Sequence, residues 1–234
     1  MRLFRPQHSV VNGTTRLEAY SDAVIAIILT ILVLELHVPE LHEETFHGVF
    51  AGIGGMLPDL LSFAFSFLGI SVFWVNHHHF FHEIDKTDGR FLWLNNALLF
   101  WLSLVPFTTA FLGEHPFVPG VMFIYCLVLF LAALSFMLMA RHAMVGGLLH
   151  EHITPLQRKK QYARNGVGVV LYAIATAAAL FLPALSMILM FAIPVYYIAP
   201  RLMHDHGNAD ASLSDSPPCS DRRRAFGACP SRSP

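Results

Sequence analysis

The chain has 234 residues and a formal net charge of −1, and 55% of its residues are hydrophobic while only 13% are charged. A typical soluble domain carries about 25% charged residues, so this composition predicts a polytopic membrane protein without a soluble catalytic domain. The near-neutral charge excludes the basic surface of a nucleic-acid-binding protein, and the three scattered cysteines exclude a disulfide framework.

Apolar segments with the length of membrane spans follow one another along residues 1–203, and we predict an all-α protein with six transmembrane helices. The segments are Leu17–Val38, Met56–His79, Phe91–Leu112, Phe117–Ala140, Gly166–Leu182 and Ala184–Ala199. The last two are separated by Pro183 and together exceed one crossing, which favours two spans joined by a tight turn. One bent helix over 166–199 is the alternative.

The distribution of basic residues predicts the orientation of these spans. All 15 lysines and arginines lie in the N-terminal arm, in the loops after the second and fourth segments, or in the tail. The opposite loops, at 39–55, 113–116 and around 183, contain none. Because cytoplasmic loops are rich in lysine and arginine, both termini are predicted to be cytoplasmic. Residues 204–234 are rich in Ser, Pro, Asp and Arg and are predicted to form a disordered cytoplasmic tail.

The first segment combines a polar start with an apolar helix that has two distinct faces. At 100° per residue, its larger aliphatic side chains form one stripe, on which Arg16 and Tyr20 also fall. The stripe contains Ile27, Ile31 and Leu34, with Thr30 at its margin. Periodicity alone favours ordinary packing or lipid contact for this stripe, because every predicted helix is apolar all round.

Asp22 lies about 140° from that stripe and is predicted to face a neighbouring helix. A carboxylate inside a membrane span needs a polar partner. The alternative is a helix that starts later, with Asp22 as an acid in its first turn.

The end of the second segment supplies candidate partners at the same depth as Asp22. It contains Trp74, Asn76 and His77, and we predict His77 or Asn76 as the hydrogen-bond donor to Asp22. His78 and His82 have the i, i+4 spacing of two metal ligands on one helix face. We predict no metal site, because neither cysteines nor a convincing set of carboxylates completes the ligands.

The two polar motifs resemble a known family. Arg16-x-x-x-Tyr20-Ser21-Asp22 at the start of the first span is similar to the Arg-x-x-x-Phe-Ser-Asp signature of the transmembrane-protein-175 family of potassium channels. Trp74-Val75-Asn76-His77-His78 also resembles that family's second span. The resemblance covers about residues 12–200. The sequence departs from the signature at Tyr20, whose ring preserves packing while its hydroxyl needs a partner.

The resemblance implies a homotetramer in the inner or plasma membrane that conducts potassium ions passively, without an enzymatic step or a cofactor. The constriction would be formed by rings of Ile27, Ile31 and Leu34, with Thr30 as a polar layer. Ser21 and Asp22 would tie the first helix to the second through Trp74 and His77. The alternative function is a histidine-bearing membrane protein that handles electrons or metal ions.

Overall fold

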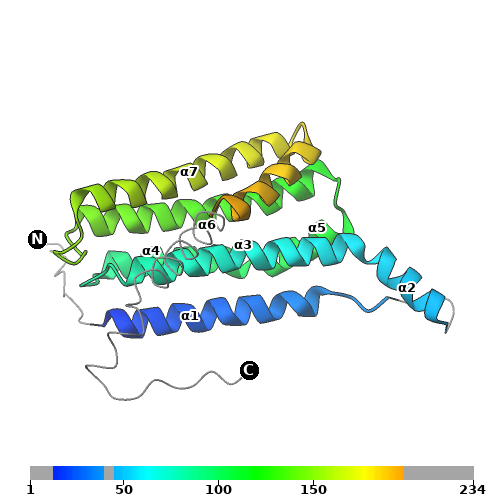
Figure 1. Cartoon of the computed structure of the whole chain (residues 1–234), viewed down its shortest axis with the longest axis horizontal. Helices are drawn as coiled ribbons and strands as arrows, with labels where there is room; N and C mark the ends of the chain where they lie inside the picture. The colour runs from blue at the N-terminus through cyan, green and yellow to red at the C-terminus, as the bar shows by residue number, and fades with distance from the viewer. Residues whose placement is uncertain (1–12, 40–44, 198–234) are drawn as a thin grey trace, which may run out of the picture. The chain divides into compact units, whose positions relative to one another are not determined.

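The computed structural model describes residues 13–39 and 45–197, and over these residues the chain is built from helices and short connections (Figure 1). The predicted tail at 204–234 and two of the cysteines lie outside the described residues. The helices are α1 (Thr14–Ile31), continued by the 3₁₀ turn η1 (Leu32–Glu35), α2 (Phe46–Gly55), α3 (Leu57–Phe81), α4 (Gly89–Ser103), α5 (Val105–Glu114), α6 (Pro119–Val145), α7 (Pro155–Ala179) and a final helix at Pro183–Tyr197. The all-α prediction is confirmed for this part of the chain.

Residues through Pro194 form one compact unit, and the arrangement described below is that of this unit. The second unit, Val195–Pro234, is described only for residues 195–197, which complete the final helix.

The first four predicted spans are present as apolar helices long enough to cross a membrane. Within the described residues they run over Thr14–Glu35, Leu57–Phe81, Gly89–Glu114 and Pro119–Val145. The third of these is broken into α4 and α5 at Leu104. Pro106 stands in the first turn of α5, where its missing N–H removes one bond of the helical ladder.

The last two predicted segments are separate helices joined by a short turn, so the alternative of one bent helix over 166–199 is wrong. The helix α7 begins at Pro155, well before the predicted Gly166. A capping box starts it there: Thr154 Oγ1 accepts from the Gln157 amide, and the Gln157 side chain accepts from the Thr154 amide. The first turns of α7 are charged and the final helix is short, so the six membrane crossings remain a prediction.

The residues predicted as an external loop at 39–55 contain a helix. The helix α2 starts after Thr45, whose hydroxyl oxygen accepts from the Gly48 amide at 3.1 Å. The helix is apolar but has only 10 residues, too few to cross a membrane, so the search for membrane spans left it in the loop.

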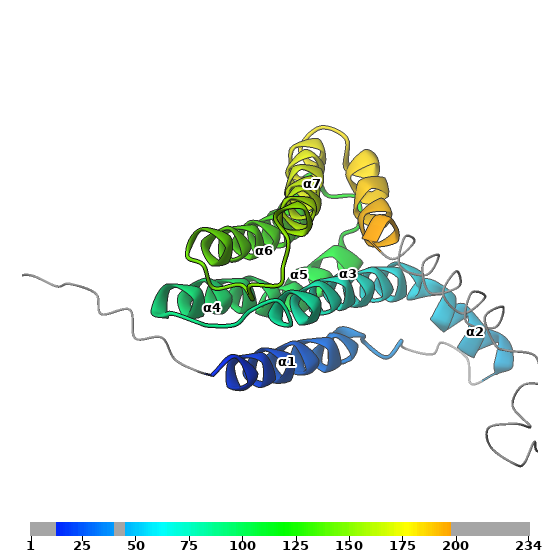
Figure 2. The same ribbon diagram turned by 60° about the vertical axis from the view of Figure 1, so that its left-hand side comes forward.

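The helices of the unit pack in layers, with α1 on one side and α7 on the other (Figures 1 and 2). The long helix α6 packs against α4 and α7, while α3 packs against α5. The helix α1, the candidate pore helix, packs mainly against α3 and α4, and the other described helices leave the rest of its surface uncovered. One end of the unit is formed by the start of α1 together with the end of α3, the start of α4, the end of α6 and the start of α7 (Figure 1).

Polar contacts brace this end of the unit. Asp88 caps α4 by accepting from the Phe91 amide at 2.8 Å, and its carboxylate lies 2.9 Å from His142 Nε2 near the end of α6. A single bridge between Ile84 and Leu149 pairs the segments that follow α3 and α6. The end of α3, which carries the second polar motif, is thereby fixed against α4 and α6.

Candidate pore face and its polar anchors

The helix α1 buries one face and exposes the predicted stripe. Ser21, Ile25, Ile28 and Leu32 are buried against α3, α4 and α5. Ile27, Ile31 and Leu34 are 57%, 38% and 77% exposed. Thr30, Tyr20 and Arg16 are also exposed. Packing against the described helices therefore does not account for the stripe, which is open to a pore, another copy of the chain or lipid.

The outer end of the stripe differs from the straight α-helix assumed in the prediction. Leu32–Glu35 form a 3₁₀ turn, in which residues three apart lie almost directly in line. Leu34 is therefore brought closer to the line of Ile31 than a continuous α-helix would place it. The Thr30 hydroxyl donates to the Ile27 carbonyl at 2.8 Å, so its oxygen lone pairs are left facing outward.

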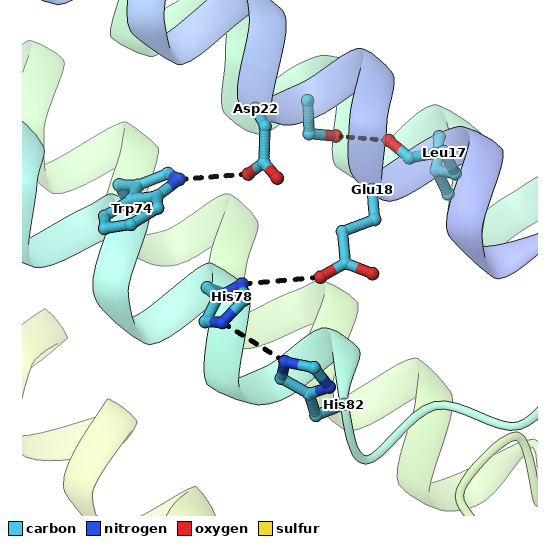
Figure 3. Close-up of polar contacts among 7 residues, drawn as sticks. Leu17, Glu18, Asp22, Trp74, His78 and His82 are labelled. Carbon is cyan, nitrogen blue, oxygen red and sulfur yellow. Dashed lines mark hydrogen bonds and ion pairs between the residues drawn. The ribbon is translucent and has the colours of Figure 1, made fainter.

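Asp22 binds α3, but its hydrogen-bond donor is not one of the two residues predicted from their depth in the membrane. Its Oδ1 accepts from Trp74 Nε1 at 3.0 Å (Figure 3). The family resemblance implied Trp74 as a partner, whereas matching depth along the two helices favoured His77 or Asn76. Asp22 lies more than two turns inside α1, so the alternative of a first-turn acid is wrong. Asn76 is buried in the same stretch of α3.

The Asp22–Trp74 bond is one rung of a ladder between two helix faces. Glu18 and Asp22 lie one turn apart on α1, and Trp74, His78 and His82 are spaced i, i+4 along α3. His78 Nδ1 lies 3.4 Å from Glu18 Oε1, and His78 Nε2 lies 3.1 Å from His82 Nε2 (Figure 3). The ladder joins α1 to α3 by partly exposed polar groups.

A second, fully buried network joins α1, α3 and α4. Asn95 of α4 donates from Nδ2 to Ser21 Oγ at 2.9 Å, and its Oδ1 lies 3.0 Å from His77 Nε2. Because the Asn95 oxygen only accepts, His77 must carry its proton on Nε2. The Ser21 hydroxyl in turn donates to the Leu17 carbonyl at 2.9 Å. Ser21, His77 and Asn95 each have no exposed surface.

Asn95 and Glu18 were not among the predicted site residues. The predicted link from His77 to the first helix exists, yet it runs through Asn95 to Ser21 instead of directly. A signal was present, because Asn95 and Asn96 are a polar pair inside an apolar segment. Amide side chains at that depth are expected to hydrogen-bond across helices.

Replacing Asp22 by Ala is expected to lower the thermal stability of the folded protein in detergent. An interhelical hydrogen bond in a membrane contributes about 0.6 kcal/mol on average and up to about 2 kcal/mol. We would measure unfolding temperatures for Asp22→Ala, Trp74→Phe and the double variant. The double variant should be no less stable than the less stable of the two single variants. Asp22→Asn keeps an acceptor oxygen, so its unfolding temperature should fall less than that of Asp22→Ala. Full additivity of the two single effects would contradict the bond.

Comparisons with known proteins agree with the position of both polar motifs. The family model for the endosomal/lysosomal potassium channel TMEM175 matches residues 16–106. A potassium channel of Chryseobacterium sp. (strain P1-3) is 33% identical over 189 residues, which cover 79% of this chain and 92% of that protein. A potassium channel of Chamaesiphon minutus is 34% identical over 191 residues, with 79% and 93% coverage.

A solved structure is also similar to the chain. The crystal structure of a lysosomal potassium-selective channel TMEM175 homolog from Chamaesiphon minutus superposes with a TM-score of 0.71 at 31% sequence identity. The match covers 80% of this chain and 97% of that chain. The similarity extends over most of the compact unit.

Proposed function

The chain belongs to the TMEM175 family of potassium channels, and from this membership we propose that it conducts potassium ions passively through a pore lined by α1. Its relatives are channels and not enzymes. The alternative of a redox or metal-handling protein is not favoured, because those relatives are named as potassium channels.

The exposed stripe of α1 is the observation that carries the proposed pore. Ile27, Ile31 and Leu34 are large, apolar and uncovered by the helices that the structure describes, while the opposite face of α1 packs against α3 and α4. Four copies arranged around an axis would turn each exposed residue into a ring. An aliphatic ring resists ions because it offers nothing to replace their hydration shell. Thr30 would add a ring of hydroxyl oxygens between two aliphatic rings.

The proposed orientation in the inner or plasma membrane places the start of α1 and the chain's termini in the cytoplasm. The described basic residues support it, because they lie in the connections and terminal turns of the helices beside the start of α1, or, for Arg164, somewhat further inside α7. They are Arg16, Lys86, Arg90, Arg141, Arg158, Lys159, Lys160 and Arg164. Such a concentration of positive charge is typical of the cytoplasmic side of a membrane protein.

Potassium flux from liposomes tests the proposed function. Liposomes that contain the purified protein and a potassium gradient should release potassium faster than empty liposomes, without any energy source. The oligomeric state of the same preparation is checked by cross-linking, with four copies expected. A folded tetramer that gives no flux above that of empty liposomes would contradict the proposal.

A further inference from the structure

A cluster of three metal-ligating side chains lies at the end of the α1–α3 contact that the proposed orientation places in the cytoplasm. Glu18 of α1, His78 of α3 and His82 at the C-terminal cap of α3 each offer a ligand atom, and these atoms lie within 4.8 Å of one another. We propose that this cluster binds a divalent transition-metal cation of the zinc type, and that the ion clamps α1 to α3. The prediction of no metal site rested on the lack of a convincing set of carboxylates and did not consider Glu18 on the first helix.

The distance between the two imidazoles fits a shared ion. Two nitrogen ligands at about 2.0–2.1 Å from a tetrahedral zinc ion are separated by about 3.3 Å. His78 Nε2 and His82 Nε2 are already 3.1 Å apart and face one another (Figure 3). Without an ion, the same contact is a hydrogen bond in which only one ring can donate, so an ion replaces a single bond by two ligand bonds.

The surroundings of His78 also suit a ligand. The indole ring of Trp74 stacks on the His78 imidazole, with ring centroids 5.7 Å apart and planes 20° from parallel. The Glu18 carboxylate lies 3.4 Å from His78 Nδ1, the ring nitrogen that does not contact His82 (Figure 3). A rotation of the Glu18 side chain brings an oxygen toward the ion, and its negative charge offsets that of the cation.

The donor set selects the class of ion. Imidazole and carboxylate ligands suit zinc, nickel, cobalt and copper, whereas magnesium and calcium prefer oxygen ligands only. Three protein ligands leave a fourth position for water, and the exposed side of His82 gives the ion access from solvent.

Metal binding can be measured directly on detergent-solubilised protein, independently of ion conduction. Zinc binding by calorimetry and bound zinc after gel filtration would be compared for the wild type, Glu18→Gln, His78→Gln and His82→Gln. Each ligand substitution is expected to remove one ion per chain or to weaken that binding at least about tenfold, because even second-shell changes cost about 10–100-fold. His79→Gln is the matched control, since it lies in the same histidine run but outside the cluster, and it should bind as the wild type does.

Two further readouts separate this site from the chain's other histidines and from misfolding. Zinc should raise the unfolding temperature of the wild type and the His79→Gln variant, but not of His82→Gln, whose exposed side chain can be replaced without loss of the fold. Cobalt should give the visible absorption of a tetrahedral site only where all three ligands are present. Zinc binding and thermal stabilisation that persist unchanged in both His78→Gln and His82→Gln would overturn the proposal.

Discussion

Replacing Asn95 by Leu is expected to destabilise the folded chain by about 2–4 kcal/mol. The substitution removes the shared partner of Ser21 and His77, both of which have no exposed surface. A buried polar group that loses its hydrogen bond costs about 1–3 kcal/mol. Measured interhelical bonds in membranes are weaker, at about 0.6 kcal/mol on average. We expect the larger value to dominate here, because His77 Nε2 loses its acceptor and the Ser21 oxygen loses a donor, and neither side chain has exposed surface.

The neighbouring Asn96 provides the matched control for this prediction. Asn96 is exposed on the same helix, one residue away, and has the same side chain. Denaturant unfolding in detergent should therefore show a much smaller change for Asn96→Leu than for Asn95→Leu. Equal losses of stability in the two variants would contradict a buried network centred on Asn95.

A double-mutant cycle then distinguishes the network from simple packing. Ser21→Ala should destabilise the wild type, because the Asn95 amide loses its acceptor. In the Asn95→Leu background the same change should have little further effect. A Ser21→Ala effect of the same size in both backgrounds would show that the two residues act independently.

Helical periodicity predicted the orientation of α1 well but not the residues that meet it. The angular positions of Asp22 and Ile27 along one helix follow from its sequence, and the structure separates them as predicted: Asp22 binds α3, while Ile27 is exposed. The neighbours depend on how far side chains reach across an interface. The Trp74 indole reaches Asp22, whereas His77, three residues later, points to Asn95 on α4.

Estimates from membrane depth and hydropathy gave wrong helix bounds or partners where an element departs from a uniform apolar helix. The helix α7 begins in charged residues because its capping box fixes its start, and hydropathy detects only the later, apolar part. Glu18 was missed as a partner of His78 because only Asp22, one turn later, was treated as the carboxylate that needs a partner. The 3₁₀ turn at Leu32–Glu35 has no distinctive residue type, so its effect on Leu34 was not predictable from spacing.

Polar substitutions on the exposed stripe of α1 are expected to change ion permeation more than any other single changes. Ile27→Asn, Ile31→Asn and Leu34→Asn would each place amide groups in a ring that is otherwise aliphatic. Water enters a polar ring more readily, so the barrier to ions should fall. A reduction of about 1.4 kcal/mol in that barrier raises the ion flux about tenfold. The preference for potassium over sodium should weaken at the same time, because a wetter ring discriminates less between the two ions.

Reversal potentials and single-channel conductances in planar bilayers would measure both effects, with Leu29→Asn as the control. Leu29 is a half-buried residue of the same helix, lying on the side of Asp22 and away from the stripe. Its substitution should affect stability more than permeation, since its side chain would not line the pore. An altered potassium-to-sodium ratio in Leu29→Asn, with ratio and conductance unchanged in the three stripe variants, would place the pore on the other face of α1.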